Sequence, residues 1–196
     1  TTGVGEVDMF SLLKNSFRQN PDYVIVGEVR GKEAYVLFQG MASGHASIST
    51  IHADSVESVI RRLETRPISL NPALVNSLDA VAIMSHVIVD GKETRKLREI
   101  VEIVNVEENG DAVTNSPFFW DPAKDKFYFK KDSKVFEKIE KKNGISRERL
   151  LEEFELRTKL IYEIFRRKIF SFDEVEMIIN EYYKNPSAVL QKFGIK

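Results

Sequence analysis

The spacing of apolar residues predicts alternating helices and strands over the first half of the chain. Phe10, Leu13 and Phe17 share one face of a helix that begins after Asp8, a residue type that favours helix N-termini. The next apolar run, YVIV at 23–26, is apolar at every position. Such a run is typical of a strand buried on both faces in a parallel sheet. We therefore expect a helix followed by a buried strand.

The same pattern continues to residue 89. A β-prone stretch covers Ser47–Ala53, and a capping-box-like pair, Asp54 and Glu57, precedes a strongly amphipathic helix. Asn71 opens a short helix, and Ala80–Val89 predicts a third buried strand. The apolar faces expected on the two longer helices are Ala34, Leu37, Phe38 and Met41, with Gly44 after them, and Val56, Val59, Ile60 and Leu63. Strands separated by helices favour a parallel sheet covered by helices.

From about Lys96 the pattern changes to hairpins and then to helices. REIVEIVNV is strand-like, NG at 109–110 is typical of a hairpin turn, and FFWD with KFYF predicts a second hairpin around DP at 121–122. From Ser133 onward the pattern is helical, with a capping box at Ser171 and Glu174. The expected helical faces are Leu150, Phe154, Ile161 and Phe165 on one helix, and Val175, Ile178, Ile179 and Tyr182 on the next.

These elements predict an α/β fold in two parts. Residues 1–132 are expected to form a helix-covered sheet with an antiparallel extension, and residues 133–196 a small all-helical appendage. With 196 residues, of which 42% are hydrophobic, the chain can bury a good core. The 29 basic residues nearly cancel the 30 acidic ones, so we do not expect nucleic acid as a partner.

The residue types that are missing narrow the chemistry. Cysteine is absent, which excludes disulfides, thiolate zinc sites and cysteine nucleophiles and agrees with a reducing compartment. No apolar stretch approaches the length of about 20 residues that a membrane-crossing helix needs. We expect a cytoplasmic protein.

Candidate chemistry first appears directly after the YVIV strand. Gly27 allows a tight turn, and Glu28 and Arg30 then lie where the carboxyl end of a parallel strand presents residues to ligands. A surface ion pair between Glu28 and Arg30 is the alternative interpretation of the same spacing.

The second candidate is SGHASISTIHADS, which carries two of the three histidines of the chain. His45 and His52 are seven residues apart, so on one continuous strand they would face opposite sides. His52 and Asp54 offer two metal ligands, but no further nearby His or Cys completes a site, and we predict no metal held by protein ligands alone. His86 is interpreted as a polar residue at a strand end.

Together these stretches resemble a known family. NPDYVIVGEVRGKEA looks like the Walker B region of the type II and type IV secretion ATPases, and SGHASISTIHADSVESVIRRL looks like their histidine box. The preceding GEVDMFSLLKNSFRQ is similar to the archaeal branch, which drives pilus and archaellum assembly. The resemblance covers residues 3–63 well, and REIVEIVNV and FFWDPAKDKF also resemble that branch. Gly31 departs from the bacterial pattern, in which aspartate commonly follows the arginine.

The resemblance implies a partial RecA-like sheet and an ATPase site that uses ATP and Mg²⁺. Glu28 matches the glutamate that polarises the attacking water, and His52, near Ser49 and Thr50, matches a residue that senses the γ-phosphate. Arg18 matches a family arginine that precedes the Walker B strand, and either Arg18 or Arg30 would offset charge at the site or across a subunit boundary. By the same resemblance, His45, the first histidine of the box, and Thr50 are candidates for nucleotide binding.

The G-x-x-x-x-G-K-[ST] motif that grips phosphates does not occur in the sequence, and TTGVGEV lacks its lysine. The resemblance therefore implies the carboxy-terminal portion of a motor ATPase, with the isolated chain inactive. The parent is expected to form a homo-hexamer in the cytoplasm, docked on a polytopic membrane platform protein at the inner face of the membrane. Two alternatives remain open: a DNA-translocating or conjugation ATPase, and a non-catalytic interaction module.

Overall fold

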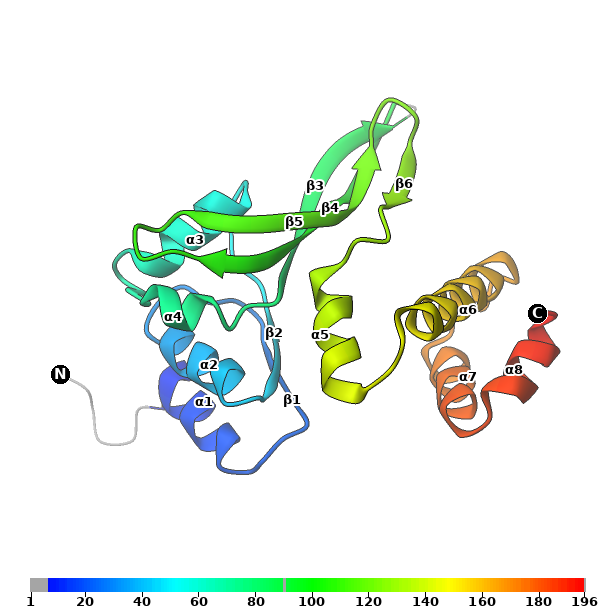
Figure 1. Cartoon of the computed structure of the whole chain (residues 1–196), viewed down its shortest axis with the longest axis horizontal. Coiled ribbons are helices and arrows are strands. Elements are labelled where there is room, and N and C mark those ends of the chain that lie inside the picture. The colour runs from blue at the N-terminus through cyan, green and yellow to red at the C-terminus, as the bar shows by residue number, and fades with distance from the viewer. Residues whose placement is uncertain (1–6, 90, 196) are drawn as a thin grey trace. The chain divides into compact units, whose positions relative to one another are not determined.

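The computed structural model describes residues 7–89 and 91–195 (Figure 1). The opening TTGVGE lies outside these residues. Two compact units are present, Thr1–Val135 and Phe136–Lys196, called unit 1 and unit 2 below. The boundary that we place after residue 132 from the sequence remains a prediction about domain organisation.

Unit 1 begins with the expected succession of helices and strands. Its elements are α1 (Met9–Phe17), β1 (Tyr23–Val26), α2 (Glu33–Ala42), β2 (Ala46–Ser49), α3 (Val56–Glu64), α4 (Pro72–Val75), β3 (Ala80–Val89), β4 (Lys92–Val106), β5 (Ala112–Asp121) and β6 (Lys126–Phe129). Asp8 caps α1 by accepting a hydrogen bond from the N–H of Ser11. α3 is capped by Ser55, which accepts from the N–H of Ser58. The cap predicted at Asp54 is therefore one residue too early.

β1 and β2 form a two-stranded parallel sheet, with Val26 opposite Ser49. One face of β1 is buried, because Val24 and Val26 join the same core as Leu13 of α1 and Leu37 of α2. The other face is open: Tyr23 and Ile25 are 68% and 75% exposed. The prediction of a strand buried on both faces is wrong for the described chain, because the core lies against one face of β1.

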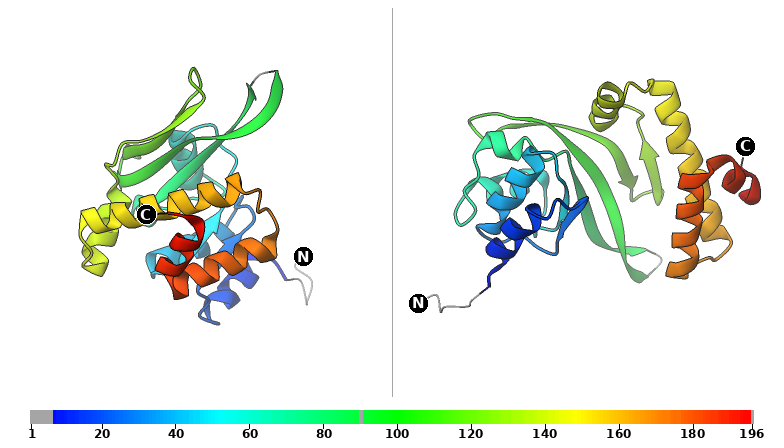
Figure 2. Two further views of the ribbon diagram at one scale, coloured as in Figure 1. Left: turned by 90° about the vertical axis from the view of Figure 1, so that its right-hand side faces the viewer. Right: turned by 90° about the horizontal axis from the view of Figure 1, so that it is seen from below.

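The second sheet is antiparallel, in the order β3-β4-β5-β6, and its long strands curve in both views of Figure 2. The hairpins predicted at residues 109–110 and 121–122 are confirmed. The interpretation of Ala80–Val89 as a third buried strand of the parallel sheet is wrong. This strand pairs with β4 in antiparallel register, with Val89 opposite Lys92, and only Ile83 among its described residues is buried. The antiparallel part therefore begins at Ala80 rather than near Lys96.

One core joins the two sheets of unit 1. Val24 and Val26 of β1 belong to the same buried cluster as Ile60 of α3 and Val101 and Ile103 of β4. A side chain at Gly40 of α2 would overlap the ring of Phe17, so glycine permits the close approach of α1 and α2. This packing fixes α2 and α3 against the strands whose ends carry the candidate site.

The described residues of unit 2 form four helices, and the last three of them supply the buried residues of its small core. The helices are α5 (Lys134–Asn143, which begins at the end of unit 1), α6 (Arg147–Arg166), α7 (Phe172–Lys184) and α8 (Pro186–Phe193). The buried residues are Leu160, Ile164, Ile178, Tyr182, Val189 and Phe193. Ser171 is the N-cap of α7 but accepts no capping hydrogen bond, so the predicted capping box does not form.

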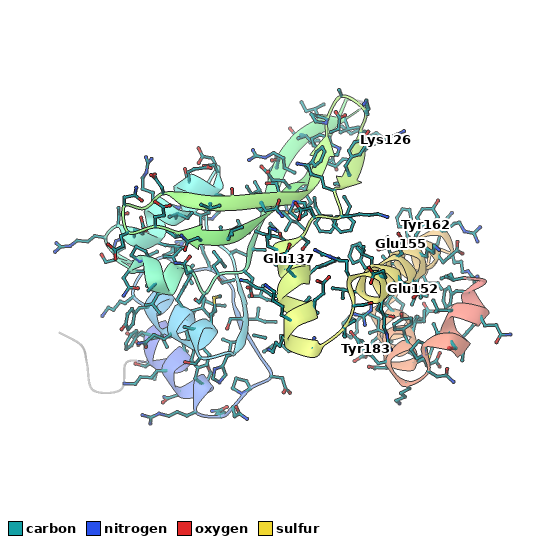
Figure 3. All side chains as sticks on the ribbon, viewed as in Figure 1. Lys126, Glu137, Glu152, Glu155, Tyr162 and Tyr183 are labelled. Carbon is teal, nitrogen blue, oxygen red and sulfur yellow. The ribbon has the colours of Figure 1, made fainter. Side chains whose placement is uncertain are left out.

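The apolar face predicted on α6 is wrong in its second half. Ile161 and Phe165 are 68% and 66% exposed, whereas Leu160 and Ile164 are buried. Successive helix residues are about 100° apart, so a sequence that is apolar on two adjacent faces does not indicate which one is buried. Tyr162 and Tyr183, labelled in Figure 3, are also exposed.

Candidate functional site

The carboxyl ends of β1 and β2 bring Glu28 and His52 together. Oε1 of Glu28 lies 3.4 Å from Nε2 of His52. Two hydrogen bonds tie the segments that follow the strands: the Thr50 hydroxyl donates to the Gly27 carbonyl at 2.5 Å, and the Val29 N–H donates to the Thr50 carbonyl at 3.0 Å. Parallel register therefore places these residues at one edge of the sheet, where α/β folds bind ligands.

Arg30 contacts the other oxygen of the same carboxylate. Its Nη2 lies 2.6 Å from Oε2 of Glu28, and the two side chains are 76% and 27% exposed. The hydrogen bond from Arg30 holds the pKa of the Glu28 carboxyl below its ordinary value; desolvation opposes this shift, and the charges of Arg30, His52 and Arg62 reinforce it. Glu28 is therefore ionised at neutral pH and is a weak proton acceptor.

Glu33 holds the turn that carries Arg30. Its Oε1 accepts hydrogen bonds from the backbone N–H groups of Arg30 at 2.6 Å and Gly31 at 2.8 Å. Burial acts to raise the pKa of Glu33, but these backbone hydrogen bonds outweigh it and the pKa is lowered. The first turn of α2 thus fixes the backbone that follows Glu28.

A cavity of about 400 Å³ adjoins the Glu28–His52 pair. Its lining residues are Glu28, Val29, Arg30, Ile51, His52, Arg62, Thr65, Arg66, Pro67 and Ile68. Its volume lies within the range of small-molecule sites, and three guanidinium groups suit an anionic ligand. Among residues 7–89 and 91–195, no three His, Asp or Glu side chains are grouped as a metal site would require.

The donor set fits Mg²⁺ bound together with phosphate. Mg²⁺ is commonly held by one or two carboxylates plus phosphate oxygens and water, rather than by a full protein cage. Glu28 supplies an ionised, partly exposed carboxylate, and Thr50 supplies a hydroxyl oxygen at the same edge. The arginines of the cavity would face the phosphate charge.

Sequence reasoning missed Arg62. Its Nη1 donates a hydrogen bond to the backbone carbonyl of His52. The sequence gives only RR at 61–62 near the end of an amphipathic helix, a pattern that is typical of a solvated helix face. Glu33 was also missed, because a first-turn glutamate is common in helices.

Arg18 and His45 lie at the opposite edge of the parallel pair. Arg18 follows α1 and precedes the amino end of β1, and His45 precedes the amino end of β2. The His45 ring packs edge-on against Phe17, with ring centroids 4.9 Å apart, and its Nδ1 is buried with no hydrogen-bond partner among the described residues. Within one chain, the described contacts do not bring Arg18 or His45 to Glu28.

The sequence matches the family described as Type II/IV secretion system protein over residues 2–143. The chain belongs to this family, which confirms the resemblance inferred from the sequence. Unit 2 lies mostly beyond the matched residues.

Individual relatives cover different shares of the chain. It is 37% identical to uncharacterized protein MJ1287 of Methanocaldococcus jannaschii over 90% of this chain and 66% of that protein. It is 35% identical to conjugal transfer protein TrbB of Rhizobium radiobacter over 53% of this chain and 32% of that protein. The chain thus spans about two thirds or less of these relatives. The X-ray structure of the ATPase DotB of Yersinia pseudotuberculosis matches with a TM-score of 0.35 at 21% identity, covering 56% of this chain and 25% of that chain.

Across the described residues, no helix combines the length and apolar character that crossing a membrane requires.

Proposed function

We propose that this chain is a portion of an ATPase that hydrolyses ATP to drive a membrane-associated assembly or secretion machine. The observation that carries the proposal is the Glu28–His52 pair, which lies at the carboxyl edge of a parallel sheet and beside an arginine-lined cavity. Membership of the secretion family supports the choice of ATP as substrate. In this account the β1 strand is the Walker B strand of a RecA-like domain.

Glu28 orients and polarises the attacking water. Phosphoryl transfer depends mainly on positioning and charge neutralisation, so an ionised carboxylate of low basicity is sufficient for this role. Its 27% exposed side chain can reach a water in the cavity. Arg30 and Arg66, which line the cavity, offset the negative charge that develops on the phosphate.

His52 reports the state of the nucleotide. The ring is 84% exposed and touches Glu28, so it is free to contact a γ-phosphate bound beside that carboxylate. Thr50 supplies a second polar group on the same segment. Glu28 would hold Mg²⁺ together with the nucleotide, and the bound ion would supply positive charge that offsets the phosphate charge there.

The complete protein is proposed to work as a homo-hexamer on a polytopic platform protein at the cytoplasmic face of the membrane. Secretion, type IV pilus assembly and archaellum assembly are the machines that the family resemblance implies. Arg18 and His45, which lie at the other edge of the sheet, would then act only across a subunit boundary. A nucleotide bound near that boundary could be contacted by Arg18 and His45 of the neighbouring subunit, although these residues do not reach Glu28 of their own chain.

DNA transfer is the second candidate, because TrbB is named as a conjugal transfer protein. A non-catalytic interaction module is the third. Phosphate release from Mg-ATP by the longer parent protein, measured with and without DNA, separates the three. Hydrolysis that DNA does not stimulate supports the secretion or pilus role, stimulation by DNA supports conjugation, and no phosphate release contradicts the proposed activity.

A further inference from the structure

Arg62 connects α3 to the segment that carries His52. It donates to the His52 backbone carbonyl and lines the cavity that Glu28 and His52 also line. The main cause of the lowered pKa of Glu28 is the hydrogen bond from Arg30, and the charge of Arg62 also contributes. The guanidinium therefore lies near both members of the Glu28–His52 pair.

The packing of α3 fixes the direction of this arginine. The buried side of the helix consists of Val56, Val59, Ile60 and Leu63, and the Ser55 cap fixes where the helix begins. Because successive residues are about 100° apart, Arg62 projects from one flank of that buried side and Arg61 projects from the exposed face of the helix. Arg62 reaches the cavity, whereas Arg61 does not line it. The neighbouring arginine is therefore a matched control.

Contacts to the backbone hold the segment that carries His52. The ring is 84% exposed, so burial does not fix its position. The backbone is held on both sides of Ile51: the Thr50 carbonyl accepts from the Val29 N–H, and the His52 carbonyl accepts from Arg62. The segment is also anchored by Ile51, which packs against the core, and by Arg98, which donates to the Asp54 carbonyl at 3.4 Å. Arg62 provides the contact at the His52 peptide itself.

We infer that Arg62 is a positioning residue, which places the His52 ring opposite Glu28 by holding the peptide carbonyl of His52. This inference rests on the proposed function only for its effect on hydrolysis. The hydrogen bond from Arg62 to the His52 carbonyl is present in the chain without nucleotide. Arg62 thereby couples α3 to the segment that carries His52.

The first test follows the three histidine ring resonances by NMR in the 196-residue chain, with His52 assigned from His52→Ala. Arg62→Met should shift and broaden the His52 resonance and leave those of His45 and His86 in place. Arg61→Met should change none of them. Arg62→Lys keeps a cationic N–H donor and should return the His52 resonance toward that of the wild type. An unchanged His52 resonance in Arg62→Met overturns the inference, and so does an equal change in Arg61→Met or a joint change of all three histidines.

The second test uses steady-state kinetics of the longer parent protein. Arg62→Met should lower kcat about tenfold or more while KM for Mg-ATP stays within about threefold, because positioning affects the transition state more than binding. A raised KM with unchanged kcat would make Arg62 a phosphate ligand and overturn the positioning role. If the parent hydrolyses no ATP, the proposed function fails, whereas the NMR result still decides whether Arg62 holds the His52 segment.

Discussion

Oε1 of Glu28 lies 3.4 Å from Nε2 of His52, although the two residues follow different strands. Oε2 of the same carboxylate lies 2.6 Å from Arg30. Glu28 is therefore held from two sides, by one residue of its own turn and by one residue of the neighbouring segment. A substitution of His52 should therefore alter the position of the Glu28 carboxylate without altering the core.

His52→Ala should reduce hydrolysis and weaken ATP-dependent oligomerisation of the parent protein more than it weakens folding. The reason is that the ring is exposed and contacts Glu28 rather than the core. His86→Ala is the control, because this histidine is exposed on β3. It should leave hydrolysis and ATP-dependent oligomerisation unchanged. Hydrolysis and oligomerisation that both match the wild type in His52→Ala would remove the sensing role.

Glu33→Gln should destabilise unit 1 at neutral pH by about 1 kcal/mol, because a neutral amide oxygen is a weaker acceptor than an ionised carboxylate for the N–H groups of Arg30 and Gly31. Because the folded-state pKa of Glu33 is lowered from 4.5, the ionised carboxylate stabilises the fold above that value. This stability is lost as the pH falls through the folded pKa. The difference between wild type and variant should therefore be present at pH 7 and vanish in acid.

Urea unfolding followed by fluorescence measures this effect, because Trp120 of unit 1 is the single tryptophan of the sequence. Glu93→Gln, an exposed carboxylate on β4, is the control. A difference for Glu33→Gln that is the same at pH 7 and in acid would mean that the charge of Glu33 is not what holds the turn.

How much of the site the sequence predicts depends on the kind of signal. Glu28 follows one β-prone run, and Thr50 and His52 lie in the last residues of the next; parallel strands collect such residues at one edge, so their proximity was predictable. Arg62 acts on a backbone carbonyl, and no residue pattern records such a contact. Its position became visible only with the packing of α3.

The errors in the fold have a similar origin. The apolar run at Ala80–Val89 fits either a buried parallel strand or one strand of an antiparallel hairpin, and the choice depends on the partner strand. On α6, Ile164 and Phe165 lie on adjacent apolar faces, and only contacts with α7 and α8 decide between them. Local periodicity predicts the elements better than it predicts their partners.

The 196-residue chain should bind Mg-ATP very weakly. A P-loop supplies most of the N–H donors and the lysine that hold the β- and γ-phosphates, and its motif does not occur in this sequence. Since ligand stabilisation grows as RT ln(1 + [L]/Kd), millimolar Mg-ATP should scarcely raise the melting temperature when Kd is about 1 mM or weaker. A longer protein that carries the P-loop should gain several degrees under the same conditions. Micromolar binding by the 196-residue chain would contradict this prediction.

The most direct test of the account is the turnover of Glu28→Gln in the longer parent protein. The amide keeps the shape of the side chain and removes the charge that polarises water, so ATP binding should stay near the wild-type level while kcat falls by orders of magnitude. Single-turnover hydrolysis of Mg-ATP, measured beside equilibrium nucleotide binding, separates the two quantities. Binding retained with hydrolysis nearly abolished is the predicted result, and turnover within a few-fold of wild type would contradict the assignment of Glu28 as the catalytic carboxylate.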